Sequence, residues 1–415
     1  MTAKILIALL SGALVGILLN YVVPDWKWVD SYITNGLFYI LGQGFIRLMQ
    51  MLVVPLVFCS LVCGSMSIGD TKKLGAVGGK TIVFYVVTTA VAISLSLGIA
   101  NIINPGTGLD MSAVMEEAAD SVTTGERTSF ADTLLGMIPT NLFAALAEGN
   151  MLPIILFALL LGVILAKMKD RSETVERFFF QGNEIMMEMT ELIMKAAPLG
   201  VFCLIAKTFA VTGFDALVPL LKYIGAVLLA LAVHCVVVYL GLLKVFTGLS
   251  PVLFVQKFFP AMAFAFSTAT SNATIPMSID LLETKMGVSK RISSFTIPLG
   301  ATVNMDGTAI MQGAAVVFAA QAYGIGLSAL DYFTVISTAT MASIGTAGVP
   351  GVGLITLTMV FQSVGLPADG IALIMGIDRI LDMARTAVNI TGDAVCTTII
   401  ASGSGALDRD IYMKK

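Results

Sequence analysis

Hydrophobic residues gather into long runs along most of this chain, and short polar or charged stretches separate the runs. The first half contains six of them, at residues 5–23, 36–66, 81–103, 133–166, 178–212 and 217–246. A helix needs about 20 mainly apolar residues to cross a bilayer, and most of these runs reach that length. The pattern predicts membrane-spanning helices, several of them long and tilted. The first run lacks a small-x-small cleavage site after it, so we expect an uncleaved helix there.

The second half contains two apolar stretches that small polar residues interrupt midway. The interruptions lie at residues 267–274 and 342–353, and the apolar limbs beside each are too short to span a membrane comfortably. Backbone groups exposed to lipid without partners cost several kcal/mol each, so such tips persist only inside protein or beside water. The two stretches predict re-entrant hairpins, one entering from each side. Paired broken segments of this kind point to a transport site.

A further interruption lies between the two predicted hairpins. Residues 292–322 predict a helix that breaks at residues 304–308, where the sequence is Asn-Met-Asp-Gly-Thr and favours unwound backbone. Asp306 in this break is an intramembrane carboxylate with no neighbouring base. Carboxylates, amides, hydroxyls and backbone carbonyls are hard ligands, and a low charge per site favours a monovalent ion. The break therefore predicts a sodium site.

A polar stripe follows inside an otherwise apolar stretch, residues 370–401. At about 100° of rotation per residue, one face of the predicted helix carries Asp378, Asp382, Arg385, Thr386, Asn389 and Asp393. A carboxylate at the bilayer centre costs about 3 kcal/mol even on lenient insertion scales. Three carboxylates with one arginine leave a negative surplus, so a cationic group is expected to bind there and leave again. The stripe by itself predicts a transporter.

The composition supports membrane insertion. Hydrophobic residues make up 57% of the 415 residues and charged residues only 12%, about half the share typical of soluble domains. The net charge of −3 gives no basic surface for nucleic acid. The five cysteines lie in apolar runs and show neither zinc spacing nor a disulfide framework. Placing the basic clusters at residues 72–80, 167–177, 285–291 and 409–415 in the cytoplasm puts both termini there as well.

Membrane-embedded enzymes and passive channels fit the sequence poorly. An intramembrane aspartyl protease with Gly-x-Gly-Asp would need glycine where this chain has Ile390. The single histidine, His234, has no Gly-x-Ser-x-Gly partner and is expected to be a core residue. A passive channel would explain the polar tips but not an acid and an arginine on one face. We therefore expect no enzymatic activity.

The order and spacing of three motifs resemble the dicarboxylate/amino acid:cation symporter family, which includes the glutamate transporters and their prokaryotic homologues. The motifs are Asn-Met-Asp-Gly-Thr at residues 304–308, Gly-Thr-Ala-Gly-Val-Pro-Gly at 345–351, and the stripe at 378–393. The resemblance covers essentially the whole chain. It implies an all-α membrane protein with eight transmembrane helices and two re-entrant hairpins. It also implies a homotrimer whose subunits work by an elevator mechanism.

The resemblance implies a division of each subunit into scaffold and moving parts. Residues 1–75 would supply scaffold helices 1 and 2, and residues 106–212 an extracellular loop with scaffold helices 4 and 5. Residues 76–105 would be helix 3 of the transport domain. Residues 213–402 would complete that domain with helix 6, hairpin 1, helix 7, hairpin 2 and helix 8. Residues 403–415 would be a cytoplasmic tail.

Substrate contacts are also implied by the resemblance. Asp382 would hold the substrate amino group and Arg385 would pair with a side-chain carboxylate, while the second hairpin tip would close as a gate. The implied substrate contacts are Ser271, Asn272, Met305, Thr308, Val349, Gly353, Asp382, Arg385, Thr386 and Asn389.

Three sites for co-transported sodium ions are implied in the same way. The first would use Gly300, Asn304, Asn389 and Asp393. The second would use Thr302, Ser343, Ile344 and Thr346. The third would use Tyr85, Thr88, Thr89, Asn304 and Asp306.

Two residues of the stripe favour an acidic amino acid as substrate. C4-dicarboxylate members of the family lack an acid at the position of Asp382. A buried Arg385 would be costly without the counter-charge that a substrate acid supplies. Sodium-driven import of L-aspartate or L-glutamate is therefore expected. The alternatives are a proton-coupled glutamate carrier, a C4-dicarboxylate carrier, and a neutral amino-acid or cystine carrier of the same family.

Three positions depart from the family's usual pattern. Ala269 and Met383 stand where many relatives carry a further arginine. Arg379 is an additional basic residue at the edge of the stripe, and we expect it to pair with Asp378 or another nearby acid.

Overall fold

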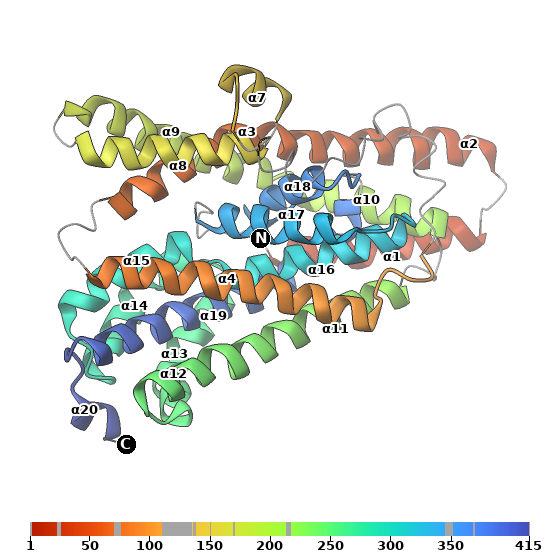
Figure 1. Ribbon diagram of the computed structural model, residues 1–415. Coiled ribbons are helices and arrows are strands. Elements are labelled where there is room, and N and C mark those ends of the chain that lie inside the picture. The colour runs from red at the N-terminus through yellow and green to blue at the C-terminus, as the bar shows by residue number, and fades with distance from the viewer. Residues whose placement is uncertain are drawn as a thin grey trace.

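The chain folds into helices that lie mostly alongside one another (Figure 1). A computed structural model describes residues 2–22, 26–69, 76–109, 135, 138–149, 151–168, 171–212, 217–344, 352–367 and 370–414. Within these ranges every named element is a helix, and one isolated antiparallel bridge joins Val288 to Leu407. The predicted all-α class is confirmed.

The helices of the N-terminal half pack mainly against one another, except for α4. In chain order they are α1 (Thr2–Val22), α2 (Lys27–Val29), η1 (Asp30–Phe38), α3 (Tyr39–Gly69), α4 (Ala76–Ile103), α7 (Leu142–Glu148), α8 (Met151–Met168), α9 (Glu173–Met194) and α10 (Ala197–Thr212). The largest contacts here pair α1 with α10 and α3 with α8 and α9, whereas α4 packs on helices of the C-terminal half. The apolar run at residues 178–212 is divided into α9 and α10, because Pro198 in the first turn of α10 has no N–H to continue the hydrogen bonds of α9 and its ring clashes with a carbonyl one turn earlier.

The C-terminal half surrounds two central helices. Its elements are α11 (Leu217–Val233), η5 (His234–Tyr239), α12 (Leu240–Thr247), α13 (Pro251–Thr268), α14 (Ser271–Thr284), α15 (Lys290–Val303), α16 (Asp306–Ala322), α17 (Ala329–Ser343), α18 (Val352–Ser363), α19 (Ile371–Gly403) and α20 (Arg409–Met413). Helices α16 and α19 contact each other and most of the remaining elements. They carry the polar residues of the predicted break and stripe.

Local sequence signals begin several of these helices. Ser250 caps α13 by accepting the Leu253 N–H, and Pro251 stands at the first helical position. Ser328 and Asp331 form a capping box at the start of α17, in which each side chain accepts the backbone N–H of the other residue.

Two of the three predicted interruptions lie within the described residues, and both are shorter than expected. Between α13 and α14 only Ala269 and Thr270 are non-helical, and Ala269 has a left-handed φ of 52°. Between α15 and α16 only Asn304 and Met305 are unwound, so Asp306 begins a helix. The prediction of unwound backbone through residue 308 is therefore wrong. The tip of the second predicted hairpin, residues 345–351, lies outside the described residues.

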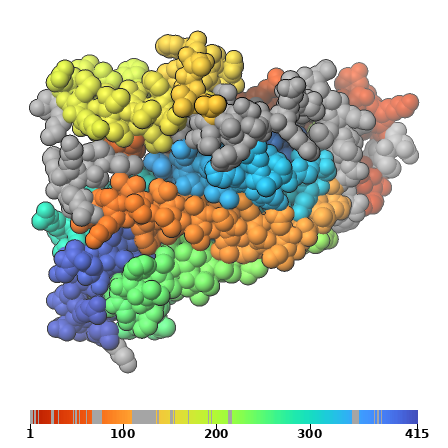
Figure 2. Space-filling model, in the orientation of Figure 1, coloured from red at the N-terminus to blue at the C-terminus, as the bar shows by residue number. Residues whose placement is uncertain are grey.

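Two helical segments of the described residues are long and apolar enough to cross a bilayer on length and composition alone. They are Val77–Ile103 and Leu217–Thr247. Figure 2 shows the surface that α4 and α11 present side by side. The exposed side chains of these two helices include Val83, Val87 and Leu228, which are apolar.

Two glycines allow α1 and α10 to approach closely. Gly12 and Gly16 are four residues apart on α1, and a Cβ at either would meet backbone atoms of α10. At Gly16 that atom would lie 2.5 Å from the Ala206 carbonyl oxygen and 2.7 Å from the Phe209 Cβ. Small residues at this spacing are typical of tightly packed membrane helices.

We predict that Gly16→Ala destabilises the protein, because the added methyl group must push α1 away from α10. Overpacking of this kind costs about 1–3 kcal/mol. The midpoint of thermal unfolding, measured in detergent by loss of the monodisperse chromatographic peak, should fall. Gly98→Ala is the matched control, since a Cβ there has no atom within 4 Å. Equal midpoints for the two variants would contradict the prediction.

Candidate functional site

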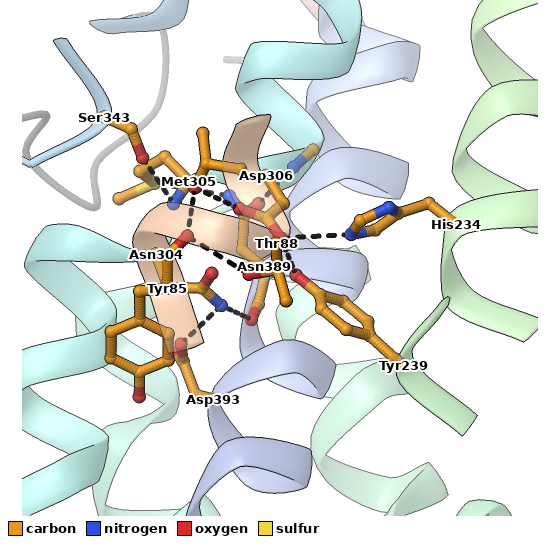
Figure 3. A network of polar contacts seen from close by, with 12 residues as sticks. Tyr85, Thr88, His234, Tyr239, Asn304, Met305, Asp306, Ser343, Asn389 and Asp393 are labelled. Carbon is orange, nitrogen blue, oxygen red and sulfur yellow. Dashed lines mark hydrogen bonds and ion pairs between the residues drawn. The ribbon is translucent and has the colours of Figure 1, made fainter. Parts of the chain in front are cut away.

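The unwound pair between α15 and α16 lies against α19 (Figure 3). The Asn304 Nδ2 donates to Asp393 Oδ1 at 2.9 Å and to the Asn389 carbonyl oxygen at 3.1 Å. Asn304 and Asp393 are both buried. One amide side chain thus joins the helix break to the polar stripe.

Gly300 brings a second part of α15 against the same carboxylate. A Cβ at this position would meet the Asp393 carboxylate and the Tyr85 hydroxyl. The buried Oδ1 of Asn304 accepts no hydrogen bond from the described residues. The first predicted ion set, Gly300, Asn304, Asn389 and Asp393, is therefore gathered in one place. A carboxylate and an unengaged amide oxygen are ligands that suit a hard cation.

Both oxygens of Asp306 already have protein partners. Thr89 Oγ1 donates to Oδ1 at 2.5 Å, and the Tyr239 hydroxyl donates to Oδ2 at 2.6 Å. The His234 Nε2 lies 3.0 Å from the same Oδ2. All four side chains are buried. The expectation that Asp306 has no neighbouring base is wrong, because the fold brings His234 to it from 72 residues away.

The π-helical segment η5 directs two of its side chains, His234 and Tyr239, towards Asp306. His234 and Tyr239 are five residues apart, which in an α-helix would point them about 140° apart. In a π-helix the hydrogen bonds join residues five apart and each turn is wider, so the two side chains lie on nearly the same side. Sequence reasoning missed Tyr239 because an α-helical periodicity places it away from His234.

The third predicted ion set converges only in part. Of Tyr85, Thr88 and Thr89 on α4, Thr89 reaches Asp306, whereas Thr88 Oγ1 donates to the Tyr85 carbonyl oxygen at 3.2 Å. The Tyr85 hydroxyl donates to the Thr296 carbonyl oxygen at 3.2 Å, so the ring points to α15.

Of the second predicted ion set, Ser343 contacts the break between α15 and α16. Its Oγ donates to the Val303 carbonyl oxygen at 2.8 Å and accepts the Met305 N–H at 3.1 Å. Thr302 Oγ1 donates within its own helix, to the Leu299 carbonyl oxygen. Ile344 ends α17. Thr346 lies outside the described residues.

Arg385 is fully buried and carries two carboxylate partners. Its Nη1 lies 2.8 Å from Asp378 Oδ1, and its Nη2 donates to Asp382 Oδ1 at 3.0 Å. The expectation that Arg385 lacks a counter-charge within the protein is therefore wrong. Arg379 Nη1 lies 3.7 Å from Asp382 Oδ2, which confirms that Arg379 pairs with a nearby acid.

Asn389 holds the first turn of α16 against α19. Its Oδ1 accepts the Gly307 N–H at 2.7 Å, and its Nδ2 lies 3.3 Å from the Met305 sulfur. The Nδ2 thus faces a weak acceptor that a stronger one could replace.

Further predicted substrate contacts surround the guanidinium group. A Cβ at Gly353 would lie 3.2 Å from the Thr308 Cγ2 and 3.6 Å from Arg385 Nη2, so α18, α16 and α19 meet there. The Thr386 hydroxyl donates to the Asp382 carbonyl oxygen at 2.8 Å within α19.

The two predicted substrate contacts at the tip of the first hairpin, Ser271 and Asn272, are less well connected to α19 than the other predicted contacts that the structure describes. Ser271 is buried and Asn272 is exposed, and among the described residues no hydrogen bond joins either side chain to α19. Val349 lies outside the described residues.

The sequence matches the sodium:dicarboxylate symporter family over residues 1–402. The chain belongs to this family. It is 38% identical over 413 residues to the proton/glutamate-aspartate symporter of Escherichia coli K12, covering 98% of this chain and 93% of that protein. It is 36% identical over 403 residues to the proton/sodium-glutamate symport protein of Geobacillus stearothermophilus, covering 96% and 94%. It is 34% identical over 399 residues to a C4-dicarboxylate transport protein of Cupriavidus necator, covering 95% and 90%.

Membership of this family makes the chain a membrane symporter and not an enzyme. The geometry adds three residues to the predicted site of the symporter. Asp378 binds Arg385, while His234 and Tyr239 bind Asp306. Asp378 could have been found from its place in the stripe, whereas Tyr239 gave no sequence signal.

We predict that Gly300→Ala slows transport by this symporter about a hundredfold. The added Cβ would displace the Asp393 carboxylate and the Tyr85 hydroxyl. Since misplacement by about 1 Å can cost about a hundredfold in rate, the rate of substrate uptake should fall by about that factor. Gly79→Ala on α4, where a Cβ meets no atom within 4 Å, should transport normally. Comparable uptake by both variants, at equal membrane levels, would contradict the prediction.

Proposed function

We propose that this chain is a secondary active symporter that imports an acidic L-amino acid, aspartate or glutamate, together with sodium ions. The observation that carries the proposal is the buried group of Asp378, Asp382 and Arg385 on one face of α19. This group can bind an amine and a carboxylate at the same time.

Some atoms of this group have no hydrogen-bond partner among the described residues, and they match the polar groups of an amino acid. Asp382 Oδ2 accepts no hydrogen bond from the described residues and has an ion pair of 3.7 Å with Arg379, so it retains the capacity to receive a substrate ammonium group. The Nε of Arg385 also has no hydrogen-bond partner among them. A substrate carboxylate would compete with Asp378 for the guanidinium group, with which it can form two parallel hydrogen bonds. A C4-dicarboxylate has no amine and would place a carboxylate beside Asp382, so the geometry disfavours it.

Sodium coupling rests on the gathered oxygen ligands. The oxygens of Asp393 and Asn304 and the carbonyl of Asn389 lie around the helix break, away from bulk water. The description of the family and the name of the Geobacillus relative both include sodium. Three sodium ions entering with one acidic amino acid would carry two net charges. Tenfold sodium gradients and 100 mV would then supply about 9 kcal/mol, enough for about a millionfold accumulation.

The proposal includes the assembly and motion expected from the family. Residues 1–75 and 106–212 would form a scaffold in a homotrimer within the plasma membrane, with both termini cytoplasmic. Residues 76–105 and 213–402 would move as an elevator. The packing of α4 against α11, α15, α16 and α17 supports its place in the moving part.

Proton coupling is the second candidate, and one observation favours it. Asp306 is bonded to His234, Tyr239 and Thr89, so its oxygens are engaged without a cation. The Escherichia coli relative is named a proton-coupled symporter of glutamate and aspartate. In this alternative Asp306 carries a proton in place of a third sodium ion.

We predict that labelled L-aspartate enters proteoliposomes under an inward sodium gradient and not under a proton gradient alone. L-glutamate should compete, whereas succinate and serine should not. Succinate lacks the amine that Asp382 would bind, and serine lacks the side-chain carboxylate that Arg385 would bind. Uptake driven by protons alone would favour the second candidate. Asp306→Asn then tests it, since the neutral amide would allow exchange across the membrane but not accumulation.

We predict that Asp382→Asn raises the KM for L-aspartate about tenfold to a hundredfold. The substitution removes a charged acceptor whose hydrogen bonds are worth about 1.5–3 kcal/mol. The KM is measured from initial uptake rates. Asp280→Asn, an exposed carboxylate on α14, should leave the KM unchanged. A KM in Asp382→Asn equal to that of the unmodified protein would exclude Asp382 as the amine-binding residue.

A further inference from the structure

The last helix, α20, lies at the end of the molecule where α12, α13 and α14 turn (Figure 1). Tyr412 on α20 is fully buried, and its hydroxyl donates to the carbonyl oxygen of Ser250, the cap of α13, at 2.9 Å. Arg409 Nη2 donates to the carbonyl oxygen of Thr247, the last residue of α12, at 2.9 Å. The C-terminal residues are therefore bonded to the start of the first hairpin rather than forming a separate tail.

The segment before α20 pairs with the turn that follows the same hairpin. The Asp408 N–H donates to the Gly287 carbonyl oxygen at 2.8 Å, and the Ser289 N–H donates to the Ala406 carbonyl oxygen at 3.0 Å. Gly287 has φ of 72°, and a Cβ there would meet the Asp408 carbonyl oxygen. The left-handed backbone and the close approach both require glycine.

Lys257 links α13 to the ends of α14 and α20. It is a cation in the apolar limb α13, and its Nζ donates to the carbonyl oxygens of Lys285, Ile411 and Tyr412 at 2.8, 2.9 and 2.7 Å. These oxygens lie at the ends of α14 and α20, where helix carbonyls lack partners and the helix dipole is negative. One ammonium group therefore joins both limbs of the hairpin to α20.

The far end of this hairpin needs external support. Its tip holds Ala269 at φ 52°, a conformation that costs a non-glycine residue free energy and persists only where surrounding contacts enforce it. Ser271, the first residue of α14 and a predicted substrate contact, is buried. Two short helices joined by two residues transmit a shift at the base directly to the tip.

We propose that Lys257 is a positioning residue. Together with residues 404–414 it forms a C-terminal clasp that fixes the base of hairpin 1 and so holds the tip, residues 269–271, at the transport site. The consequence for substrate affinity rests on the proposed function, whereas the clasp itself does not.

The test compares Lys257→Met with the unmodified full chain in lipid nanodiscs by hydrogen–deuterium exchange. Amides of residues 265–275 should exchange about tenfold faster, as expected when charged hydrogen bonds are lost, while α16 stays unchanged. In proteoliposomes the KM for L-aspartate should rise about tenfold with kcat within about twofold. Lys257→Arg should restore both values. Lys244→Met is the matched control, since Lys244 Nζ donates to Gly248 at the end of its own helix.

Tyr412→Phe provides a second variant if Lys257→Met does not fold. It removes the hydrogen bond to Ser250 and leaves the aromatic ring, 5.5 Å from the Lys257 ammonium, in place. It should also speed exchange at residues 265–275.

Unchanged exchange at the tip in the folded variants would overturn the clasp. Faster exchange with an unchanged KM would overturn the positioning role, because the contacts would then be structural only. Absence of aspartate uptake by the unmodified protein under every gradient would count against the proposed function, and the exchange result would decide the clasp by itself.

Discussion

Every polar group in the interior of this symporter needs a partner, and the break between α15 and α16 is where that requirement is greatest. Two unwound residues release backbone donors and acceptors into a site with little water, where an unpaired group costs several kcal/mol. Ser343 takes up the Val303 carbonyl and the Met305 N–H, and Asn389 takes up the Gly307 N–H. The side chains that satisfy the break are therefore those that hold α16, α17 and α19 together.

The same requirement governs the charges. Arg385 is paired with both Asp378 and Asp382, so under the proposed function a substrate carboxylate would replace one carboxylate partner with another. The two carboxylates lower the cost of keeping the arginine buried. The replacement would also mean that the affinity for substrate reflects a difference between two ion pairs.

The π-helical segment shows how a local backbone irregularity serves a distant site. An unbroken α-helix through residues 234–239 could present His234 or Tyr239 to Asp306, but not both. The wider turn of the π-helix places both side chains against one carboxylate. The π-helical segment η5 is thereby tied to the start of α16 by two side-chain contacts.

The sequence by itself determined the all-α class, the interruption between α13 and α14, the break near Asn304 and the shared face of Asp378, Asp382, Arg385, Asn389 and Asp393. These features follow from local composition and from the rotation of a helix, which neighbouring residues decide. Tertiary structure alone decided the partners: His234 for Asp306 across 72 residues, Asp378 for Arg385, and Tyr412 for Lys257 across 155 residues. It also shortened the breaks, because tertiary packing made it favourable for Asp306 to begin α16. A local pattern reports which face a residue occupies, whereas the group that meets that face depends on how distant helices pack.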